Sequence, residues 1–196
     1  MCLVGKKGSG KSKLCLKLLT TWGGLRGVFD RVVIISPTFK AQFASLWSAI
    51  DPHGLEVYEE VNEMLLEAII LHQSTSSDKA LIISDDNGED WRRVAPSVTN
   101  KLISNSRHLH ISCLFLAQKM TQLPVIVRSN ADVFAVFQAN SHLEQTALFN
   151  EVSTVDRRTF DRMFQTATEE QYSFLVSAVL EGKLRFFKNF STEITP

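Results

Sequence analysis

The sequence lacks any apolar run long enough to cross a membrane, because none of its hydrophobic stretches approaches about 18 residues. It also lacks a charged segment followed by a long apolar core at the N-terminus, so we expect no signal peptide. Internal repeats and low-complexity segments are missing as well. With 44% hydrophobic and 21% charged residues, the 196-residue chain has the composition of an ordinary globular protein rather than a disordered one.

Cysteine is scarce, and its placement is not that of a metal site or a disulfide framework. The three cysteines, Cys2, Cys15 and Cys113, lie far apart without metal-type spacing. Because Cys15 and Cys113 fall inside predicted core elements, we interpret them as reduced, buried thiols. This use of cysteine is typical of an intracellular protein.

Net charge is absent too. Lysine and arginine number 21, aspartate and glutamate also number 21, and the formal charge is therefore zero. A protein that coats nucleic acid with its whole surface is expected to be basic. If this chain handles DNA, the contacts must come from a few local basic segments.

What the sequence does contain begins at its N-terminus with a phosphate-binding pattern. Residues 5–12 fit G-x-x-x-x-G-K-[ST], preceded by a short apolar run and followed by a leucine-rich helical pattern from about Lys11. Glycines in this loop let the backbone approach phosphates closely, and the helix N-terminus adds its positive dipole end. We expect ATP to be bound by Gly5, Lys6, Lys7, Gly8, Ser9, Gly10, Lys11 and Ser12. The alternative is a glycine-rich turn that matches the pattern by chance.

The rest of the chain alternates apolar, β-branched runs with amphipathic segments. We expect strands at residues 31–36, 55–58, 79–86, 110–117 and 132–137. Helices are expected at residues 39–50, 61–72, 94–106, 143–152 and 157–166, with a short helical or irregular stretch at 123–130 and a polar loop at 73–78. Met64, Leu65, Ala68 and Leu71 are expected to face inward.

This alternation predicts one α/β domain, 1–196, with a mostly parallel, doubly covered sheet. The expected fold is the three-layer α/β/α P-loop NTPase fold of the ASCE, RecA-like type. Its core covers about residues 1–152. A C-terminal helix and a β-hairpin that joins residues 172–180 to 184–190 make up about 153–196.

Two adjacent acids end the strand predicted at residues 79–86. An acid at a rigid strand end is what holds Mg²⁺ opposite a P-loop serine, so Asp85 and Ser12 are the predicted metal ligands. The neighbouring Asp86 is placed to orient and deprotonate the attacking water. The alternative is a pair of surface acids at a turn.

A GTPase is the competing interpretation of these acids, because residues 85–88 also fit D-x-x-G. A GTPase needs N-K-x-D to bind guanine, but the pair Asn100 and Lys101 is followed by Ile103 where the acid should be. A threonine-bearing switch segment is not evident either. The sequence therefore favours an ATPase.

Further candidates follow the acids along the chain. Gln118 ends the next buried strand, where a polar residue contacts the γ-phosphate or the water in many ATPases. Arg107 and Arg128 are both candidates for an arginine finger that enters a neighbouring subunit's site, and both are equally well explained as solvated surface arginines. His108 and His110 have no partner at metal spacing, so we treat them as structural.

Candidate DNA contacts come from the segment directly after the acids. Residues 87–93 form a predicted loop in which Arg92 and Arg93 offer sequence-independent phosphate contacts. Lys119 is the next candidate. The alternative is a solvated helix start with Trp91 packed on the core.

Taken together, these motifs resemble the genome-packaging ATPases of poxviruses and other large DNA viruses, and their relatives in virophages and polinton-type elements. Those proteins belong to the FtsK/HerA branch of P-loop ATPases. The resemblance spans Leu3 to about Asn150. It rests on residues 5–12, 34–38 and 81–86, on Ser106-Arg107-His108-Leu109 with Ile111-Ser112, and then on Gln118, Leu123-Pro124, Val127-Arg128 and Asn130.

The resemblance implies a homo-oligomeric ring motor that uses ATP and Mg²⁺ to pump double-stranded DNA into a preformed capsid. A capsid vertex or portal-like partner is expected, as is a location inside the host cell (viral factory, cytoplasm or nucleus) and in the virion. By this analogy Asp86 activates water and Gln118 senses the γ-phosphate. Arg107 is the first candidate for the arginine finger, and Arg128 is the second. After about Val152 the likeness is weak, so no function is transferred there.

Two other classes of function compete with a packaging motor. One is a cellular or plasmid DNA-pumping ATPase or helicase of the same superfamily, which usually carries extra domains. The other is a P-loop interaction protein that binds nucleotide without hydrolysing it. Asp86 and Gln118 argue against the latter, because pure binding needs neither.

Overall fold

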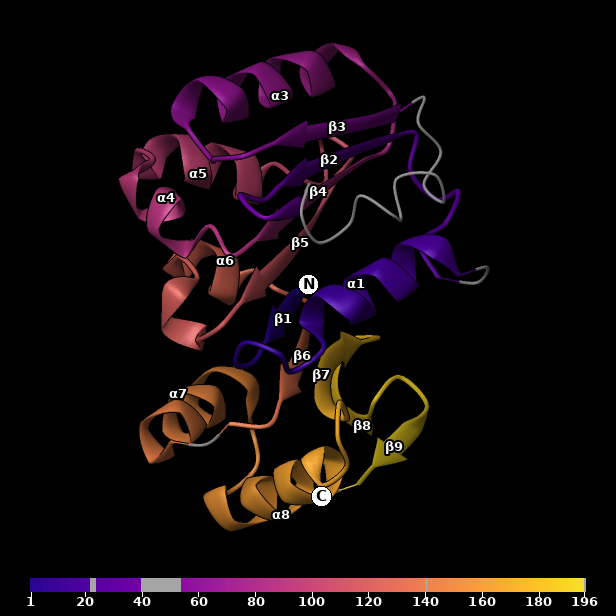
Figure 1. Ribbon diagram of the computed structural model, residues 1–196, viewed down its shortest axis with the longest axis vertical. Coiled ribbons are helices and arrows are strands. Elements are labelled where there is room, and N and C mark those ends of the chain that lie inside the picture. Colours follow the sequence, from indigo (N-terminus) through magenta and orange to yellow (C-terminus); the bar gives the residue numbers. More distant parts are fainter. Residues whose placement is uncertain (22–23, 40–53, 140, 196) are drawn as a thin grey trace. The chain divides into compact units, whose positions relative to one another are not determined.

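The computed structural model describes residues 1–21, 24–39, 54–139 and 141–195 (Figure 1). The chain divides into two compact units. The first contains residues 1–11, 117–123 and 131–196, and the second contains residues 12–116 and 124–130. The predicted helix at residues 39–50 lies, from residue 40 on, outside the described residues.

The second unit is built on four parallel strands in the order β3-β2-β4-β5. Their bounds are Arg31–Ile35 for β2, Leu55–Tyr58 for β3, Ala80–Asp85 for β4 and Ile111–Ala117 for β5. Every residue of β4 is buried, as expected for an apolar strand with neighbours on both edges and both faces. The pairing of Ile35 with Ser84 and of Asp85 with Leu116 brings the carboxyl ends of these strands together.

Helices accompany these strands in the sequence order expected of an α/β protein. They are α1 (Lys11–Thr20), α3 (Glu63–Thr75), α4 (Gly88–Arg93), α5 (Pro96–Ser104) and α6 (Val125–Ser129). Asn62 caps α3 by accepting a hydrogen bond from the Leu65 N–H, and Pro96 starts α5 where a missing N–H costs nothing. Figure 1 shows α3 beside α5 in this unit.

The predicted inward face of α3 is wrong. The buried residues are Leu66, Ile69, Ile70 and Gln73, whereas Met64 is 78% and Leu71 70% exposed. The segment is apolar on more than one side, so its periodicity does not select a face, and packing on the sheet decides.

The loop predicted at residues 73–78 begins later than expected, because α3 continues to Thr75. Its buried Gln73 explains the difference: the side-chain amide donates to the carbonyls of Asp78 and Leu109, at 2.8 and 3.2 Å. A polar residue therefore fixes the end of the helix against the turn before β5.

The first unit combines a parallel strand pair with an antiparallel extension. Strand β1 (Cys2–Val4) runs parallel to β6 (Val133–Phe137), and the order continues through β7 (Phe174–Leu180), β8 (Lys183–Lys188) and β9 (Thr192–Ile194), which are antiparallel. The predicted C-terminal hairpin is confirmed as β7 and β8, and β9 is an additional strand.

Two helices and a short 3-10 turn complete this unit. Helix α7 (His142–Val152) is capped by Ser141 and α8 (Arg157–Thr168) by Asp156, while η3 (Met120–Gln122) follows β5. Helix α8 packs on β7 and β8 through a face that contains Phe160, Met163, Phe164 and Ala167. The α/β class with mostly parallel strands is thus confirmed. No helix in the described ranges is long and apolar enough to span a bilayer.

The cysteines differ in part from expectation. Cys15 is buried as predicted, and so is Cys2, but Cys113 is only half-buried. Burial raises the pKa of the Cys2 thiol from 9.0 to about 11. Burial and the nearby Asp85 charge raise the pKa of Cys15 to about 12, so both thiols are protonated at neutral pH.

Candidate functional site

The phosphate loop lies between β1 and α1, where its glycines adopt conformations that side chains disfavour. The φ angles of Gly8 and Gly10 are +78° and +104°. The ammonium of Lys11 folds back over the loop, donating to the carbonyls of Gly5 and Lys6 at 2.6 and 3.2 Å. Lys11 is only 8% exposed, so the cation is held inside the loop rather than in solvent.

The start of this loop has no room for a larger residue. The Gly5 N–H donates to the Ala117 carbonyl at 3.1 Å, which ties the loop to the end of β5. A Cβ at Gly5 would stand 2.6 Å from Phe137 Cβ and 2.8 Å from Ser9 Oγ. Among the residues described, Ser9 Oγ is buried and has no hydrogen-bond partner. An unsatisfied hydroxyl in a glycine-lined cradle fits a site for phosphate oxygens.

Ser12 and Asp85, which are 73 residues apart in sequence, meet in the second unit. The Ser12 hydroxyl donates to Asp85 Oδ2 at 3.3 Å, and Asp85 is 8% exposed at the end of β4. A hydroxyl and a carboxylate are oxygen ligands of the kind Mg²⁺ uses beside nucleotide phosphates. The predicted metal pair is therefore brought together, and its donors fit the ion.

Asp86 has an unusual backbone conformation. Its φ is +59°, in the left-handed region, and its N–H donates to the Leu116 carbonyl at 3.3 Å. The residue is exposed, in contrast to its buried neighbour Asp85. Strained backbone of this kind is concentrated at functional sites, and aspartate tolerates it better than most residues.

Asn87, which the sequence analysis did not single out, is buried directly after the acids. Its side-chain amide donates to the Ile35 carbonyl at 2.6 Å, linking the ends of β4 and β2. Its Oδ1 has no hydrogen-bond partner among the described residues, and the residue is 3% exposed. In the sequence, only the position of Asn87 directly after the two acids indicates that it belongs to the site.

Residues 87–93, which were predicted as a loop, are mostly the helix α4. Trp91 is 4% exposed, its indole N–H donates to Ser84 Oγ at 2.8 Å, and its ring packs edge-on against Phe115 at 5.2 Å between centroids. Of the two interpretations of residues 87–93, a helix start with Trp91 packed on the core therefore describes the structure of this segment. Tertiary packing of one indole, rather than periodicity, makes these six residues helical.

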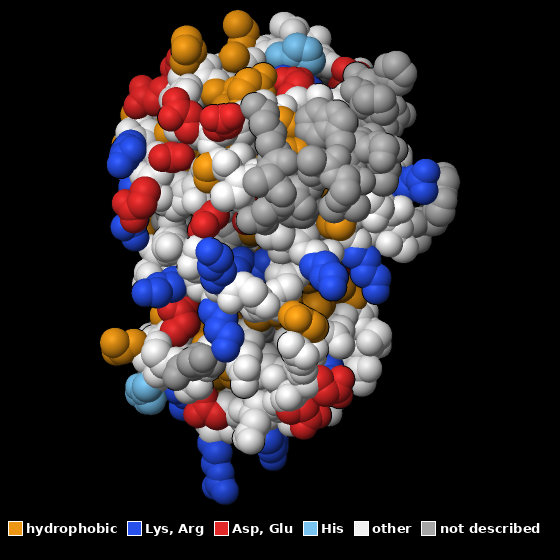
Figure 2. All heavy atoms as spheres, in the orientation of Figure 1, with side chains coloured by type: hydrophobic (Ala, Val, Ile, Leu, Met, Phe, Trp, Pro, Cys, Tyr) orange, Lys and Arg blue, Asp and Glu red, His pale blue; other side chains and the backbone are white. Residues whose placement is uncertain are grey.

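The two arginines of α4 are paired with acids on the same helix. Arg92 contacts Glu89 at 3.1 Å, and Arg93 contacts Asp90 at 3.8 Å. Figure 2 shows acidic side chains gathered over α3 and α4. Exposed pairs of this kind contribute at most about 1 kcal/mol each.

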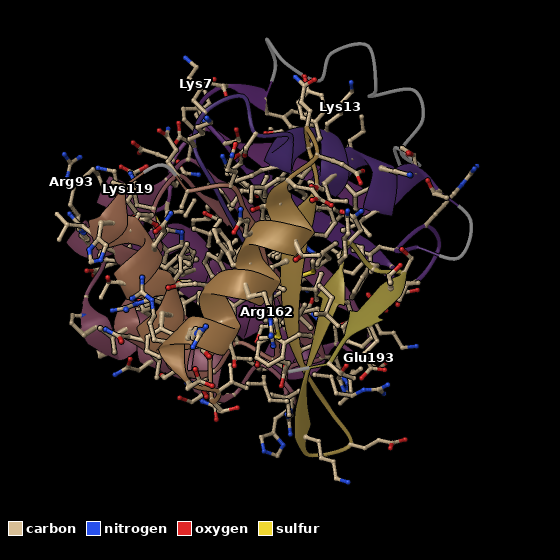
Figure 3. The ribbon with its side chains drawn as sticks, turned by 90° about the horizontal axis from the view of Figure 1, so that it is seen from below. Lys7, Lys13, Arg93, Lys119, Arg162 and Glu193 are labelled. Carbon is tan, nitrogen blue, oxygen red and sulfur yellow. The ribbon has the colours of Figure 1, made fainter. Side chains whose placement is uncertain are left out.

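Gln118 and Lys119 follow β5 in the first unit. Their backbone N–H groups both donate to Gln122 Oε1, at 2.9 and 3.0 Å, which fixes the turn. Gln118 is half-buried and directly follows Ala117, whose carbonyl accepts the Gly5 N–H, so it lies beside the phosphate loop. Lys119 and Lys7 are exposed and project outward from this unit (Figure 3).

The two candidate finger arginines lie in the second unit. Arg107 is exposed in the turn between α5 and β5, and its carbonyl accepts the His110 N–H. Arg128 is half-buried in α6. His108 and His110 are also exposed and precede β5 rather than lying in it.

A strand–glycine loop–helix motif, a parallel sheet and a serine–aspartate pair at its carboxyl edge define a P-loop NTPase. The chain belongs to the family described as Poxvirus A32 protein, which matches residues 1–181. One relative is the uncharacterized protein 075L of Invertebrate iridescent virus 6. It is 23% identical over 180 residues, which are 88% of this chain and 67% of that protein.

Solved structures share this fold. The genome packaging NTPase B204 of Sulfolobus turreted icosahedral virus 2, in complex with AMP, matches at a TM-score of 0.71 and 21% identity over 96% of both chains. The DNA-packaging ATPase B204 of Sulfolobus turreted icosahedral virus matches at 0.69 and 19% over 96% of both chains. The pCW3 conjugation coupling protein TcpA matches at 0.62 and 16%, over 97% of this chain and 59% of its own.

Proposed function

We propose that this chain is an ATP-hydrolysing motor that moves double-stranded DNA into a preformed viral capsid. The observation that carries the proposal is the hydrogen bond between Ser12 and Asp85, because it joins the end of the phosphate-loop motif to the acid strand. Membership of the Poxvirus A32 protein family and the fold shared with viral packaging NTPases support the same function.

Nucleotide binding is assigned to the phosphate loop. The backbone N–H groups of the loop, Lys7 and the Lys11 ammonium oppose the phosphate charge, and Ser9 Oγ gains the partner that it lacks within the described chain. Ser12 and Asp85 would hold Mg²⁺, which when bound neutralises phosphate charge. To hold the ion, Ser12 and Asp85 would exchange their mutual hydrogen bond for contacts with the metal.

Hydrolysis is assigned to Asp86 and Gln118. Asp86 accepts a proton from the attacking water, and its exposed carboxylate follows the buried metal ligand directly in sequence. Its backbone lies in the left-handed region, with a φ of +59°. Gln118, beside the phosphate loop, senses the γ-phosphate.

Further parts of the proposal concern partners. Arg107, exposed in a turn, completes the site of a neighbouring subunit in a homo-oligomeric ring, with Arg128 as the second candidate. Arg92, Arg93 and Lys119 contact DNA phosphates. The ring engages a capsid vertex or portal-like partner and works inside the host cell, at the site of virion assembly.

A plasmid or cellular DNA pump of the same superfamily remains the alternative function. The likeness to TcpA, a conjugation coupling protein, is a likeness of fold and does not favour that alternative over packaging. A nucleotide-binding protein without hydrolysis is less well supported, because it gives no reason for strain at Asp86.

The test measures ATP binding by calorimetry and steady-state hydrolysis with and without double-stranded DNA. We expect Lys11→Ala to abolish binding, and Asp86→Asn to retain binding while hydrolysis falls roughly 10²- to 10⁴-fold, as for loss of a general base. Glu67→Gln, which changes an exposed acid of α3 in the same unit, is the matched control and should behave as the parent. Hydrolysis by Asp86→Asn near the parent rate would refute the assigned base.

Motor activity needs a separate measurement. Displacement of a third strand from a DNA triplex reports movement along double-stranded DNA, and we expect it to require ATP and to be lost in Lys11→Ala. ATP hydrolysis that neither responds to DNA nor displaces the strand would refute a motor while leaving the ATPase in place.

A further inference from the structure

A cavity of about 360 Å³ lies in the first unit, beside the phosphate loop. Its walls include Lys6, Gly8 and Ser9 of the loop and the segment 169–173 that joins α8 to β7. Cavities of this size are typical of small-molecule sites. The phosphate-loop function assigns no role to the segment 169–173, which lies more than 150 residues away in sequence.

Strand pairing explains how this distant segment reaches the loop. Strands β6 and β7 are antiparallel with Phe137 opposite Phe174, so the start of β7 lies at the end of β6. The two rings pack with centroids 5.0 Å apart. Asn189 locks the corner, donating its N–H to the Phe174 carbonyl at 2.9 Å and accepting the Phe174 N–H at 3.3 Å.

Tyr172 is the residue that this corner presents to the phosphate loop. A Cβ placed on Gly10 would stand 3.2 Å from Tyr172 Cδ1, so the ring lies directly beside the loop. The ring belongs to a residue that is 53% exposed and has a φ of +68°. A bulky residue in the left-handed region costs about 1–2 kcal/mol, and such strain is concentrated at functional sites.

The cavity is lined by charges of both signs. Lys6 comes from the phosphate loop, whereas Glu169 and Glu170 come from the distant segment and share Lys188, at 3.1 and 2.7 Å. Two carboxylates repel a phosphate chain but accept hydrogen bonds from neutral donors. The amides of Gln138 and Gln171 also line the cavity and both donate and accept.

We infer that this cavity binds the nucleobase of the nucleotide, with the ring of Tyr172 as the surface on which the base stacks. The inference rests on the proposed ATPase function and adds where the base is held. An aromatic ring beside a phosphate cradle is suited to a planar base, and the carboxylates of Glu169 and Glu170 favour placing the phosphates at the loop rather than beside segment 169–173.

The experiment compares ATP with inorganic tripolyphosphate, which has the phosphates but no base, by calorimetry in the presence of Mg²⁺. Tyr172→Ala should weaken ATP binding about 5- to 150-fold, the range for loss of one base–aromatic stack, and leave tripolyphosphate binding unchanged. Tyr172→Phe should bind ATP as the parent does. Tyr58→Ala removes the other, also exposed, tyrosine of the chain and should change neither affinity.

Each other result refutes a different statement. Parent-like ATP binding by Tyr172→Ala, while Lys11→Ala loses both compounds, would refute the base site and keep the proposed function. An equal loss of both compounds in Tyr172→Ala would show that the ring acts only on the loop through Gly10. A parent protein that binds neither compound would refute the proposed function itself.

Discussion

At the scale of single residues, the two acids after β4 have opposite environments. Asp85 is buried and accepts a hydrogen bond from Ser12, whereas Asp86 is exposed in a left-handed backbone conformation. Such a conformation persists only where the surrounding structure enforces it, here through the hydrogen bond to Leu116. In the proposed mechanism the buried acid holds the metal ion and the exposed acid activates the water.

Gly5→Ala is expected to damage both folding and nucleotide binding. The added methyl group would meet Phe137 Cβ and Ser9 Oγ at 2.6 and 2.8 Å, and overpacking of this kind costs roughly 1–3 kcal/mol. Urea unfolding and ATP calorimetry measure the two effects. Gly27→Ala is the control for ATP affinity, which should stay at the parent value because no atom lies within 4 Å of an added Cβ. Its φ of +70° makes this variant strained, so it controls the affinity and not the stability. Parent-like stability of Gly5→Ala would contradict the tight packing at the start of the loop.

The buried thiols predict a loss of stability in alkali. The pKa of Cys15 is about 12 in the folded chain against 9.0 ordinarily, so above pH 9 the unfolded chain releases a proton that the folded chain keeps. Stability therefore falls as the pH rises from about 9 toward 12, by up to about 1.4 kcal/mol per pH unit for one thiol.

Urea unfolding of the parent and of Cys15→Ala at several pH values from 8 to 11 measures this dependence. The variant should be less stable at pH 8 but lose less stability as the pH rises. Equal slopes in the two proteins would show that Cys15 is not the group responsible.

At the scale of elements, α4 connects the acids to the surface. It begins within three residues of Asp85, is anchored by Trp91 and carries Arg92 and Arg93 outward. If Arg92 and Arg93 contact DNA as proposed, this helix would connect the acids of the nucleotide site to the DNA. The two guanidinium groups are paired with Glu89 and Asp90 of the same helix.

The double variant Arg92→Ala/Arg93→Ala is expected to weaken stimulation by DNA. It should also make the salt dependence of DNA binding shallower by up to about two charges, because two phosphate contacts are lost. Titrations at several salt concentrations measure the slope. The adjacent arginines of α8, changed in Arg157→Ala/Arg158→Ala, are the control and should leave it unchanged. An unchanged slope in the α4 variant would move the contact to Lys119.

The elements also show which inferences a sequence permits. The loop between β1 and α1, the place of Asp85 at the end of β4 and the apolar strands can be predicted because their signals are local: fixed spacing, or a buried run ending in an acid. The binding roles of the loop and of Asp85 stay predictions. The buried face of α3 cannot be predicted in this way. The helix carries apolar side chains on more than one side, and only packing on the sheet decides which side is buried.

Other features depend on contacts between segments far apart in sequence. Asn87 was missed because its hydrogen bond to Ile35 spans 52 residues. Tyr172 was missed because its position beside Gly10 depends on the pairing of β6 with β7. Helix α4 was taken for a loop because six residues with one buried indole have no measurable period.

At the scale of the whole molecule, the proposal requires more than one copy of the chain. Arg107 is exposed, which suits a side chain that acts on a neighbouring subunit. Net charge is zero, so subunits are not held apart by long-range repulsion, and assembly depends on local contacts.

Mixing two inactive variants is the test of a shared site. Arg107→Ala should lose about 10³- to 10⁵-fold in ATPase rate if it supplies the finger, and Lys11→Ala should lose nucleotide binding. Mixed rings contain borders with an intact loop and an intact finger, so activity should partly return, and parent activity should rise with protein concentration. No recovery on mixing, together with a concentration-independent specific activity, would exclude a finger supplied in trans.

Trp91 gives this protein an intrinsic optical probe. Of the three tryptophans in the sequence, it is the one within the described residues, and its indole N–H is bonded to Ser84, the neighbour of Asp85. Indole emission changes in wavelength and intensity when that bond or the ring contact with Phe115 alters. In a variant with Trp22 and Trp47 replaced by phenylalanine, the remaining fluorescence would follow nucleotide turnover in real time without any attached dye.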